Sequence, residues 1–158
     1  MHIAEFGSGK GFFALPMARI VGPDGMVYAL DIQQEELDSV RSRARAEHIL
    51  NMEPIRADLE RPMGSKLKEG HVDFVLIANM LFQVSDKQGV LREAHRIIRA
   101  GGRAALIEWD MLLMSPGPPQ EMRISKDTAT FLFTSQKFEL EREFEAGRNH
   151  YGLLFVKR

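Results

Sequence analysis

The sequence predicts an α/β fold in which helices cover both faces of a doubly wound, mostly parallel sheet. An apolar strand at residues 3–6 runs directly into a turn that contains three glycines. Residues 72–78 are apolar apart from Asp73, which is typical of a central parallel strand covered on both faces. Strand-like and helix-like segments alternate as far as residue 109, and this alternation favours strand–helix–strand units.

The turn after the first strand is typical of a site for a nucleotide-like cofactor. Residues 5–11 read EFGSGKG, with glycine at positions 7, 9 and 11. Glycine lacks a Cβ, so the backbone turns sharply there and a ligand can lie against the main chain. A helix that starts near Gly11 would add its positive N-terminal end. The alternative is that the glycines serve the turn alone.

Two common phosphate-binding motifs do not fit this turn. The dinucleotide fingerprint requires its third glycine at the position that Phe12 occupies. A Walker loop requires serine or threonine after its lysine, and Lys10 is followed by Gly11. The spacing therefore disfavours a nicotinamide-dependent oxidoreductase, which is kept as the third of three candidate functions.

Polar residues follow the next three predicted strands. The strand at 26–30 ends in Asp31, the strand at 52–57 ends at Asp58, and the strand at 72–78 ends at Asn79. An acid at the tip of the second strand is placed to accept both ribose hydroxyls of a nucleoside, at about 1.5–3 kcal/mol for each charge-assisted bond. Asp31 is also a candidate helix cap, Asp58 a candidate loop acid, and Asp73 is either structural or functional.

The remaining elements follow from helix and strand signals. A helix is expected at 34–47, and Ser85 and Gln88 predict a capping box for the next helix, which Gly101 and Gly102 end. Further elements are predicted as a strand at 103–109, a short helix at 125–134, and strands at 137–145 and 148–156, the last of them antiparallel.

Taken in order, these motifs resemble the class I S-adenosylmethionine-dependent methyltransferases, in the type 11 group that includes the ubiquinone and menaquinone C-methyltransferases. The resemblance implies a Rossmann-like, seven-stranded sheet of order 3-2-1-4-5-7-6 whose last strand is antiparallel, with S-adenosyl-L-methionine as cofactor. It implies these cofactor-binding residues: Glu5, Gly7, Ser8, Gly9, Gly11, Asp31, Ile32, Ala57, Asp58, Leu59 and Asn79. Glu5 would face the methionine end of the cofactor or pair with a neighbouring amide.

Residues for a methyl acceptor are expected in the loops at the carboxyl ends of the strands. The candidates are Met80, Leu81, Phe82, Trp109, His150 and Tyr151, joined by Met111, Leu112 and Met114. They would form an apolar, adaptable pocket or else cover the core. Methyl transfer is an in-line displacement that mainly requires alignment of the acceptor and exclusion of water, so no catalytic residue is assigned.

Composition limits the function classes. The chain has 158 residues, 44% of them hydrophobic, which suits one domain spanning residues 1–158. The formal charge of −1 disfavours nucleic acid as a partner, and the absence of cysteine excludes disulfides and thiolate metal ligands. The five histidines are scattered, so we expect no metal. No apolar run is long enough to span a membrane, and a cytoplasmic location is expected.

One feature bears on activity. Members of the resembled family normally carry a helical segment before the first strand, whereas here the strand begins at Met1. We therefore expect an open cofactor pocket, which a second copy could cover in a homodimer. The leading function is methyl transfer to a small molecule. The second is a non-catalytic relative that binds S-adenosylmethionine or acts as a partner subunit.

Overall fold

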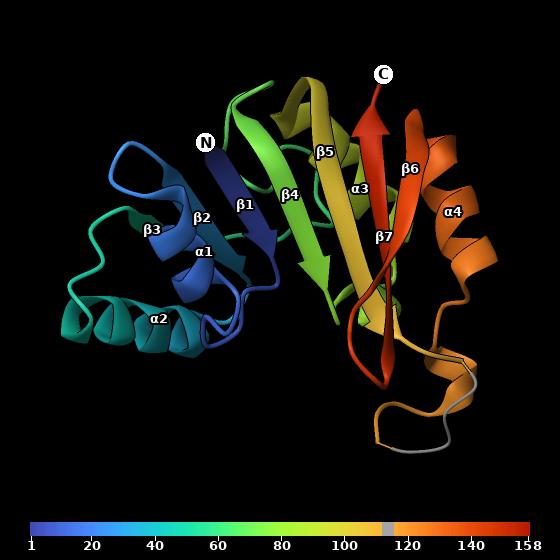
Figure 1. The fold of residues 1–158 in the computed structure, drawn as a ribbon, viewed down its shortest axis with the longest axis horizontal. Coiled ribbons are helices and arrows are strands. Elements are labelled where there is room, and N and C mark those ends of the chain that lie inside the picture. Colours follow the sequence, from blue (N-terminus) through green and yellow to red (C-terminus); the bar gives the residue numbers. More distant parts are fainter. Residues whose placement is uncertain (112–115) are drawn as a thin grey trace.

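The computed structural model describes residues 1–111 and 116–158, which form a single sheet with helices on both of its faces (Figure 1). The sheet order is β3-β2-β1-β4-β5-β7-β6, which confirms the predicted topology. The strands are β1 (His2–Phe6), β2 (Met26–Asp31), β3 (Met52–Arg56), β4 (Val72–Ala78), β5 (Ile98–Trp109), β6 (Phe138–Glu145) and β7 (His150–Lys157).

All pairings among the first five strands are parallel, and β7 lies antiparallel between β5 and β6. The helices are α1 (Ala14–Val21), α2 (Gln34–Ala46), α3 (Lys87–Ile97) and α4 (Lys126–Ser135), with 3-10 turns η1 (Leu81–Gln83) and η2 (Gln120–Met122). None of the helices in these ranges is both long enough and apolar enough to cross a membrane.

The core lies in two layers because the sheet buries both faces. Figure 1 shows α1 and α2 in front of β1–β3, and α3 behind the sheet. The larger apolar cluster includes Phe6, Leu106 and Phe133 and fills the α3–α4 side, whereas Val27 and Val40 belong to the cluster under α1 and α2. A third apolar cluster involves β4, β5 and β7 and has partly buried side chains: Phe74, Ile107 and Leu154. Phe74 also packs against the cluster under α1.

The start of α3 differs from the predicted capping box. Asp86, not Ser85, is the N-cap, and its Oδ1 accepts the N–H of Gly89 at 2.8 Å. A Cβ at Gly89 would lie 2.4 Å from Asp86 Oδ2, so glycine makes room for this cap. The backbone N–H of Asp86 donates to Glu60 Oε1 at 2.7 Å, the task expected of Gln88. A long-range contact thus replaces the local one.

The end of α3 also differs, because the helix stops before the predicted Gly101-Gly102 signal. Ile98 is already extended and pairs with Val72, so β5 begins there. Lys157 Nζ donates to the carbonyl oxygens of His95 and Ile98, both at 2.7 Å, and these bonds satisfy the end of the helix. The first helix likewise starts at Ala14 rather than near Gly11.

The cap assignment predicts an asymmetric pair of substitutions. Asp86→Ala should lower the free energy of unfolding by about 1 kcal/mol, because the amide of Gly89 loses its acceptor. Ser85→Ala is the matched control, and its stability should stay within about 0.5 kcal/mol of the wild type. Urea denaturation measures both. Equal losses in the two variants would contradict the assignment of Asp86 as the cap.

Candidate cofactor site

The three glycines of the first turn have different surroundings. All have positive φ, at 74°, 51° and 84° for Gly7, Gly9 and Gly11. A Cβ at Gly7 would lie 2.7 Å from Met80 Cγ, and one at Gly11 would lie 3.2 Å from the Val40 side chain. A Cβ at Gly9 would meet nothing within 4 Å. Gly7 and Gly11 therefore permit close packing, whereas Gly9 faces open space.

Asp31 fixes the glycine turn to the tip of β2. Its Oδ2 accepts the N–H of Gly9 and its Oδ1 accepts the N–H of Gln33, each at 2.9 Å. The amides of Gly7 and Ser8 donate to the carbonyl of Leu30 at 2.8 and 2.9 Å. Gln33 is the N-cap residue of α2, so Asp31 bonds just before the helix rather than capping it. Each carboxylate oxygen keeps a lone pair for a ligand.

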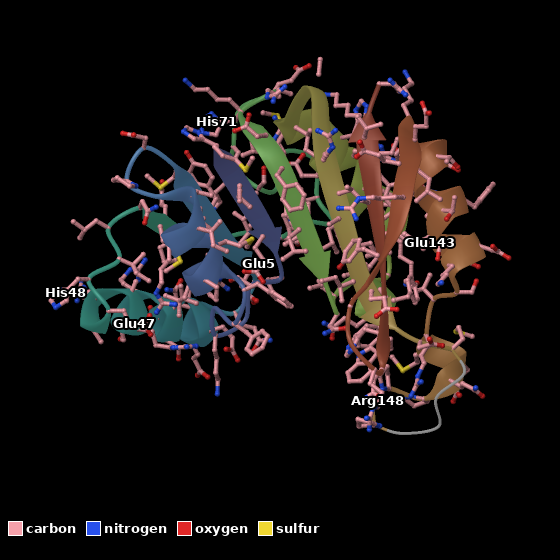
Figure 2. The ribbon with its side chains drawn as sticks, in the orientation of Figure 1. Glu5, Glu47, His48, His71, Glu143 and Arg148 are labelled. Carbon is pink, nitrogen blue, oxygen red and sulfur yellow. The ribbon has the colours of Figure 1, made fainter. Side chains whose placement is uncertain are left out.

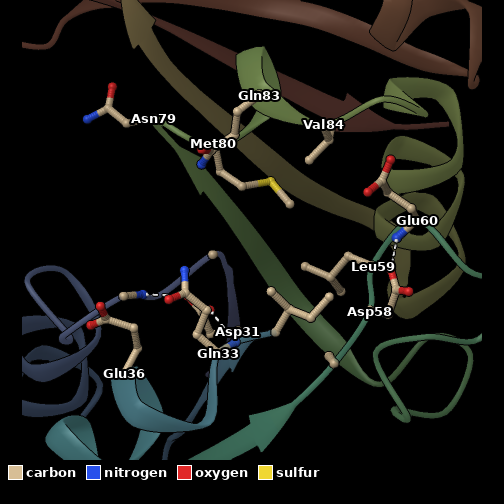
Figure 3. Close-up of a pocket in the computed structure, with 14 residues that line it drawn as sticks. Asp31, Gln33, Glu36, Asp58, Leu59, Glu60, Asn79, Met80, Gln83 and Val84 are labelled. Carbon is tan, nitrogen blue, oxygen red and sulfur yellow. Dashed lines mark hydrogen bonds between the residues drawn. The ribbon is translucent and has the colours of Figure 1, made fainter. Parts of the chain in front are cut away.

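These residues border a cavity of about 400 Å³ at the carboxyl edge of the sheet, here called the cofactor cavity (Figure 3). This volume is in the range of small-molecule sites. The predicted cofactor residues on its lining are Gly7, Gly9, Asp31, Ile32, Ala57, Asp58, Leu59 and Asn79. The lining residues that were not predicted as cofactor contacts are Gln33, Glu36, Glu60, Met80, Gln83 and Val84.

Glu5, Ser8 and Gly11 are absent from the described lining. Glu5 is 2% exposed and accepts the N–H of Ala14, the first residue of α1. Burial raises the pKa of Glu5 to about 8, and the negative charge of Asp31 adds to this. Glu5, near the end of β1 (Figure 2), thus contacts an amide, one of the two roles weighed from the sequence, and its role at the methionine end of the cofactor stays a prediction. Ser8 is also buried, and its amide holds the turn.

The two other acids weighed from the sequence have protein partners. Asp58 Oδ1 accepts the N–H of Glu60 at 3.2 Å, and its Oδ2 lies 3.1 Å from Arg61 Nε, so it shapes its own loop while bordering the cavity. Asp73 lies near the start of β4, at the other edge of the sheet. It accepts the N–H of His2 and pairs with Arg99 at 2.7 Å, which lowers the pKa of Asp73.

The loop after β4 begins with a left-handed residue. Asn79 has φ of 53°, and its N–H donates to the carbonyl of Ile107 at 2.9 Å. Its Oδ1 is buried with no hydrogen-bond partner among the described residues. Few non-glycine residues adopt this backbone conformation, and those that do cluster at functional sites.

The predicted acceptor residues separate in the structure. Met80 lines the cofactor cavity, whereas Leu81 is fully buried in the core and Phe82 packs against it. Tyr151 is also buried, and its hydroxyl donates to the Ile124 carbonyl at 2.6 Å. Burial raises the pKa of Tyr151, so it stays protonated at neutral pH. Leu81 therefore packs in the core. Tyr151 packs there too, but it also borders a hollow beside His150 that is separate from the cofactor cavity.

Trp109 and His150 form a pair at the ends of β5 and β7. Their ring centroids are 4.2 Å apart, and burial lowers the pKa of His150, which keeps the imidazole neutral at pH 7. His150 borders a second, more open hollow beside Asp110, Lys126 and Arg148. Met111 is partly buried, whereas the candidates Leu112 and Met114 lie outside the described residues.

Glu108, which the sequence reasoning did not select, is fully buried near the end of β5. Its Oε1 accepts the N–H of Phe82 at 3.2 Å, and the amides of Leu81 and Trp109 also bond to its carboxylate. Burial raises the pKa of Glu108 to about 7. An acid inside the apolar run at 104–109 is the signal that could have found it, as it found Glu5 in β1.

The raised pKa of Glu5 predicts how stability depends on pH. The unfolded carboxyl titrates near pH 4.5 and the folded one near pH 8, so the folded state binds the extra proton between these values. Stability therefore falls as pH rises through this window, on the order of several kcal/mol in total. Glu5→Gln should remove this fall and be more stable than the wild type at pH 9, with little difference at pH 4.5. Denaturant midpoints across pH test this, and parallel curves for the two proteins would contradict it.

Comparison with known proteins identifies the family. The model of a family described as "Methyltransferase domain" matches residues 4–106. A ubiquinone/menaquinone biosynthesis C-methyltransferase from Ectopseudomonas mendocina is 30% identical over 133 residues, which are 84% of this chain and 49% of that protein. The enzyme of the same name from Pseudomonas putida is 31% identical over 109 residues, or 68% and 41% of the two chains. The chain thus spans about half the length of these curated relatives.

A solved structure shares the fold. The crystal structure of a SAM dependent methyltransferase from Aquifex aeolicus superposes with a TM-score of 0.91 at 24% identity, covering 99% of this chain and 81% of that one. The family model itself matches well over half of the sequence. The chain therefore belongs to the methyltransferase domain family, which uses S-adenosylmethionine as its methyl donor.

Proposed function

We propose that this chain binds S-adenosylmethionine in the cofactor cavity and transfers its methyl group to a small-molecule acceptor. The observation that carries the proposal is the Asp31 carboxylate, fixed by the N–H of Gly9 at 2.9 Å on the rim of a cavity that Gly9 leaves open. Residues 1–158 would act as one cofactor-binding domain, and we extend the proposal to a cytoplasmic enzyme.

The chain's own residues suggest how the cofactor is held. Asp31 would accept the ribose hydroxyls through the lone pairs that its two amide contacts leave free. Ile32 is 55% exposed at the cavity, and Leu59 lines the same space, so their apolar surfaces would contact the adenine. Gly7 and Gly9 would let the methionine end approach the main chain.

The charges of the lining fit a cationic cofactor. Among the described lining residues there are four acids, Asp31, Glu36, Asp58 and Glu60, and no lysine, arginine or histidine. Such a wall repels the diphosphate of a nicotinamide dinucleotide, because like charges brought together cost free energy. It suits the positive sulfonium. The lining therefore argues against the oxidoreductase that the sequence left as its third candidate.

The bound cofactor would supply an electrophilic methyl group, and the acceptor atom would displace it in line. The protein would align the acceptor and exclude water, and such alignment contributes several kcal/mol to catalysis, up to ~7–11 in ideal cases. Met80 borders the cavity as an apolar, adaptable side chain that would contact the acceptor. A screen of small-molecule acceptors with S-adenosylmethionine would measure this transfer.

Calorimetric titration tests the proposal directly. S-adenosylmethionine and its demethylated product should bind with micromolar affinity, and NAD should not. Asp31→Ala should weaken both adenosyl ligands by about 2–4 kcal/mol, because two ribose bonds and the anchor of Gly9 are lost. Asp24→Ala, in an exposed turn, is the control. Unchanged affinity in Asp31→Ala would refute its role, and binding without turnover in the screen would assign the second, non-catalytic function.

From the sequence we expected a second copy to cover the cofactor pocket. The partly exposed apolar side chains instead lie on β4, β5 and β7, away from the cofactor cavity, and we propose that two copies associate through this face. Phe74, Ile107 and Leu154 lie on this face, and burying them removes apolar surface from water. Light scattering at micromolar concentration should report a dimer, and Leu154→Glu should shift it to monomer because a charge would be buried at the contact. A monomeric wild type would overturn this proposal without affecting cofactor binding.

A further inference from the structure

The loop between β4 and α3, residues 79–84, forms one wall of the cofactor cavity. Asn79, Met80, Gln83 and Val84 line the cavity, and Figure 3 shows them across from Asp31 and Glu36. Met80 also packs against the glycine turn, since a Cβ at Gly7 would lie 2.7 Å from its Cγ. The position of this loop therefore determines the width of the cavity.

Two side chains that do not line the cavity hold this loop. Glu108 reaches from β5 and accepts the N–H of Phe82 through Oε1 at 3.2 Å, with a further contact to the amide of Leu81. Lys87, the first residue of α3, donates from Nζ to the carbonyl of Val84 at 2.7 Å and to that of Phe82 at 3.3 Å. Glu108 thus accepts hydrogen bonds from amides of the loop, and Lys87 donates hydrogen bonds to its carbonyls.

Burying the carboxyl group of Glu108 costs desolvation free energy, which a role in core packing alone would not explain. It is fully buried, and its Oε2 has no hydrogen-bond partner among the described residues. An apolar residue of similar volume at such a place is often neutral or stabilising, because no charge is desolvated. What an apolar residue cannot do is accept the amides of Leu81 and Phe82. The presence of an acid at position 108 is therefore explained by its bonds to the loop rather than by packing in the core.

We propose that Glu108 and Lys87 are positioning residues that hold the 79–84 loop against the glycine turn and so preform the cofactor cavity. This inference rests on the proposed function, because its value to the protein is ligand binding. A preformed wall spares the ordering cost that a mobile loop would pay when the ligand binds. Loosening either anchor should therefore reduce affinity without removing any group that touches the ligand.

The charge of Glu108 gives the inference a pH signature. The positive charge of Lys87 favours the ionised acid. Buried Tyr151 is the register partner of Glu108 on β7, and the charges of Glu108 and Asp110 both act on its hydroxyl. His150 on β7 is neutral at pH 7 because burial lowers its pKa. Ionised Glu108 accepts the loop amides more strongly than the protonated acid does. The loop should therefore be held more firmly as pH rises through about 7.

The test compares matched variants by titration with S-adenosylhomocysteine, the demethylated product. Glu108→Gln keeps the shape but mimics the protonated acid, so its dissociation constant should exceed that of the wild type about 3- to 10-fold at pH 8 and should approach it at pH 6. Titration of Glu5 is common to both proteins and cancels in this ratio. Glu93→Gln is the control, because Glu93 is a buried acid that also accepts an amide, that of Ser65, away from the cavity.

Lys87→Met tests the second anchor. It keeps the length of the side chain but removes the bonds to Phe82 and Val84, and affinity should fall about 2- to 5-fold at every pH between 6 and 8. Its control is Lys157→Met, which removes the same kind of bonds from the carbonyls of His95 and Ile98 at the other edge of the sheet. Amide hydrogen exchange should rise in 79–84 for both loop variants and for neither control.

The outcomes separate the two proposals. Binding that falls as described, together with faster exchange in the loop, supports the positioning role. Wild-type affinity in Glu108→Gln and Lys87→Met, or equal losses in their controls, overturns it while leaving the proposed function intact. Failure of the wild type to bind either adenosyl ligand refutes the proposed function itself.

Discussion

The hydrogen bond from the Gly9 amide to the Asp31 carboxylate is the contact on which the site depends. Parallel strands bring their carboxyl ends to one edge, but they do not by themselves fix the loops that follow. Here the tip of β2 accepts Gly7 and Ser8 through the Leu30 carbonyl and Gly9 through Asp31. The turn after β1 is thereby built against β2. Its open side at Gly9 borders the cofactor cavity.

Two acids are buried near the carboxyl edge of the sheet, and the free energy lost by burying them must be offset by the rest of the fold. Glu5 and Glu108 are both buried, in β1 and β5, and burial raises the pKa of each. Between them lies β4, whose tip leads into the loop at 79–84. Two acids held partly protonated near neutral pH reduce repulsion at this edge, where Asp31 is also close to Glu5. Burial of the apolar layers on both faces of the sheet stabilises the fold and offsets the free energy lost by burying these acids.

Local patterns were enough to predict most of the individual strands, because a strand and its terminal residue are signalled by short-range chemistry, whereas the order of the strands in the sheet came from the family resemblance. The strand Val72–Ala78 agrees with its sequence signal, and α4 lies within one residue of the helix expected at 125–134. The predicted start of α3 was wrong. The backbone N–H of its N-cap residue, Asp86, donates to Glu60, and no local sequence pattern connects these two residues. A capping box describes four consecutive residues, so it cannot predict that the N-cap amide donates to a side chain from another loop.

The cavity shows the same division between local and long-range information. Residues that follow a strand directly, such as Asp31 and Asn79, were predicted to lie at the edge, and they do line the cavity. Gln83 and Val84 were missed as lining residues, since a loop's path depends on the anchors that hold it rather than on its own sequence. For Leu81 the sequence left both a pocket and a core position open, because its apolar character fits the two equally well, and the structure places it in the core.

The strand order explains why the cavity forms at this place on the edge. Chain direction along the sheet reverses between β1, which leads outward to β2 and β3, and β4, which leads the other way to β5. The loops after β1 and β4 therefore diverge toward opposite faces and leave a crevice between them. The packing of Met80 against Gly7 closes the bottom of that crevice, and the anchors on 79–84 set its far wall. Cofactor affinity in this domain should therefore be tuned from β5 and α3 as much as from the glycine turn.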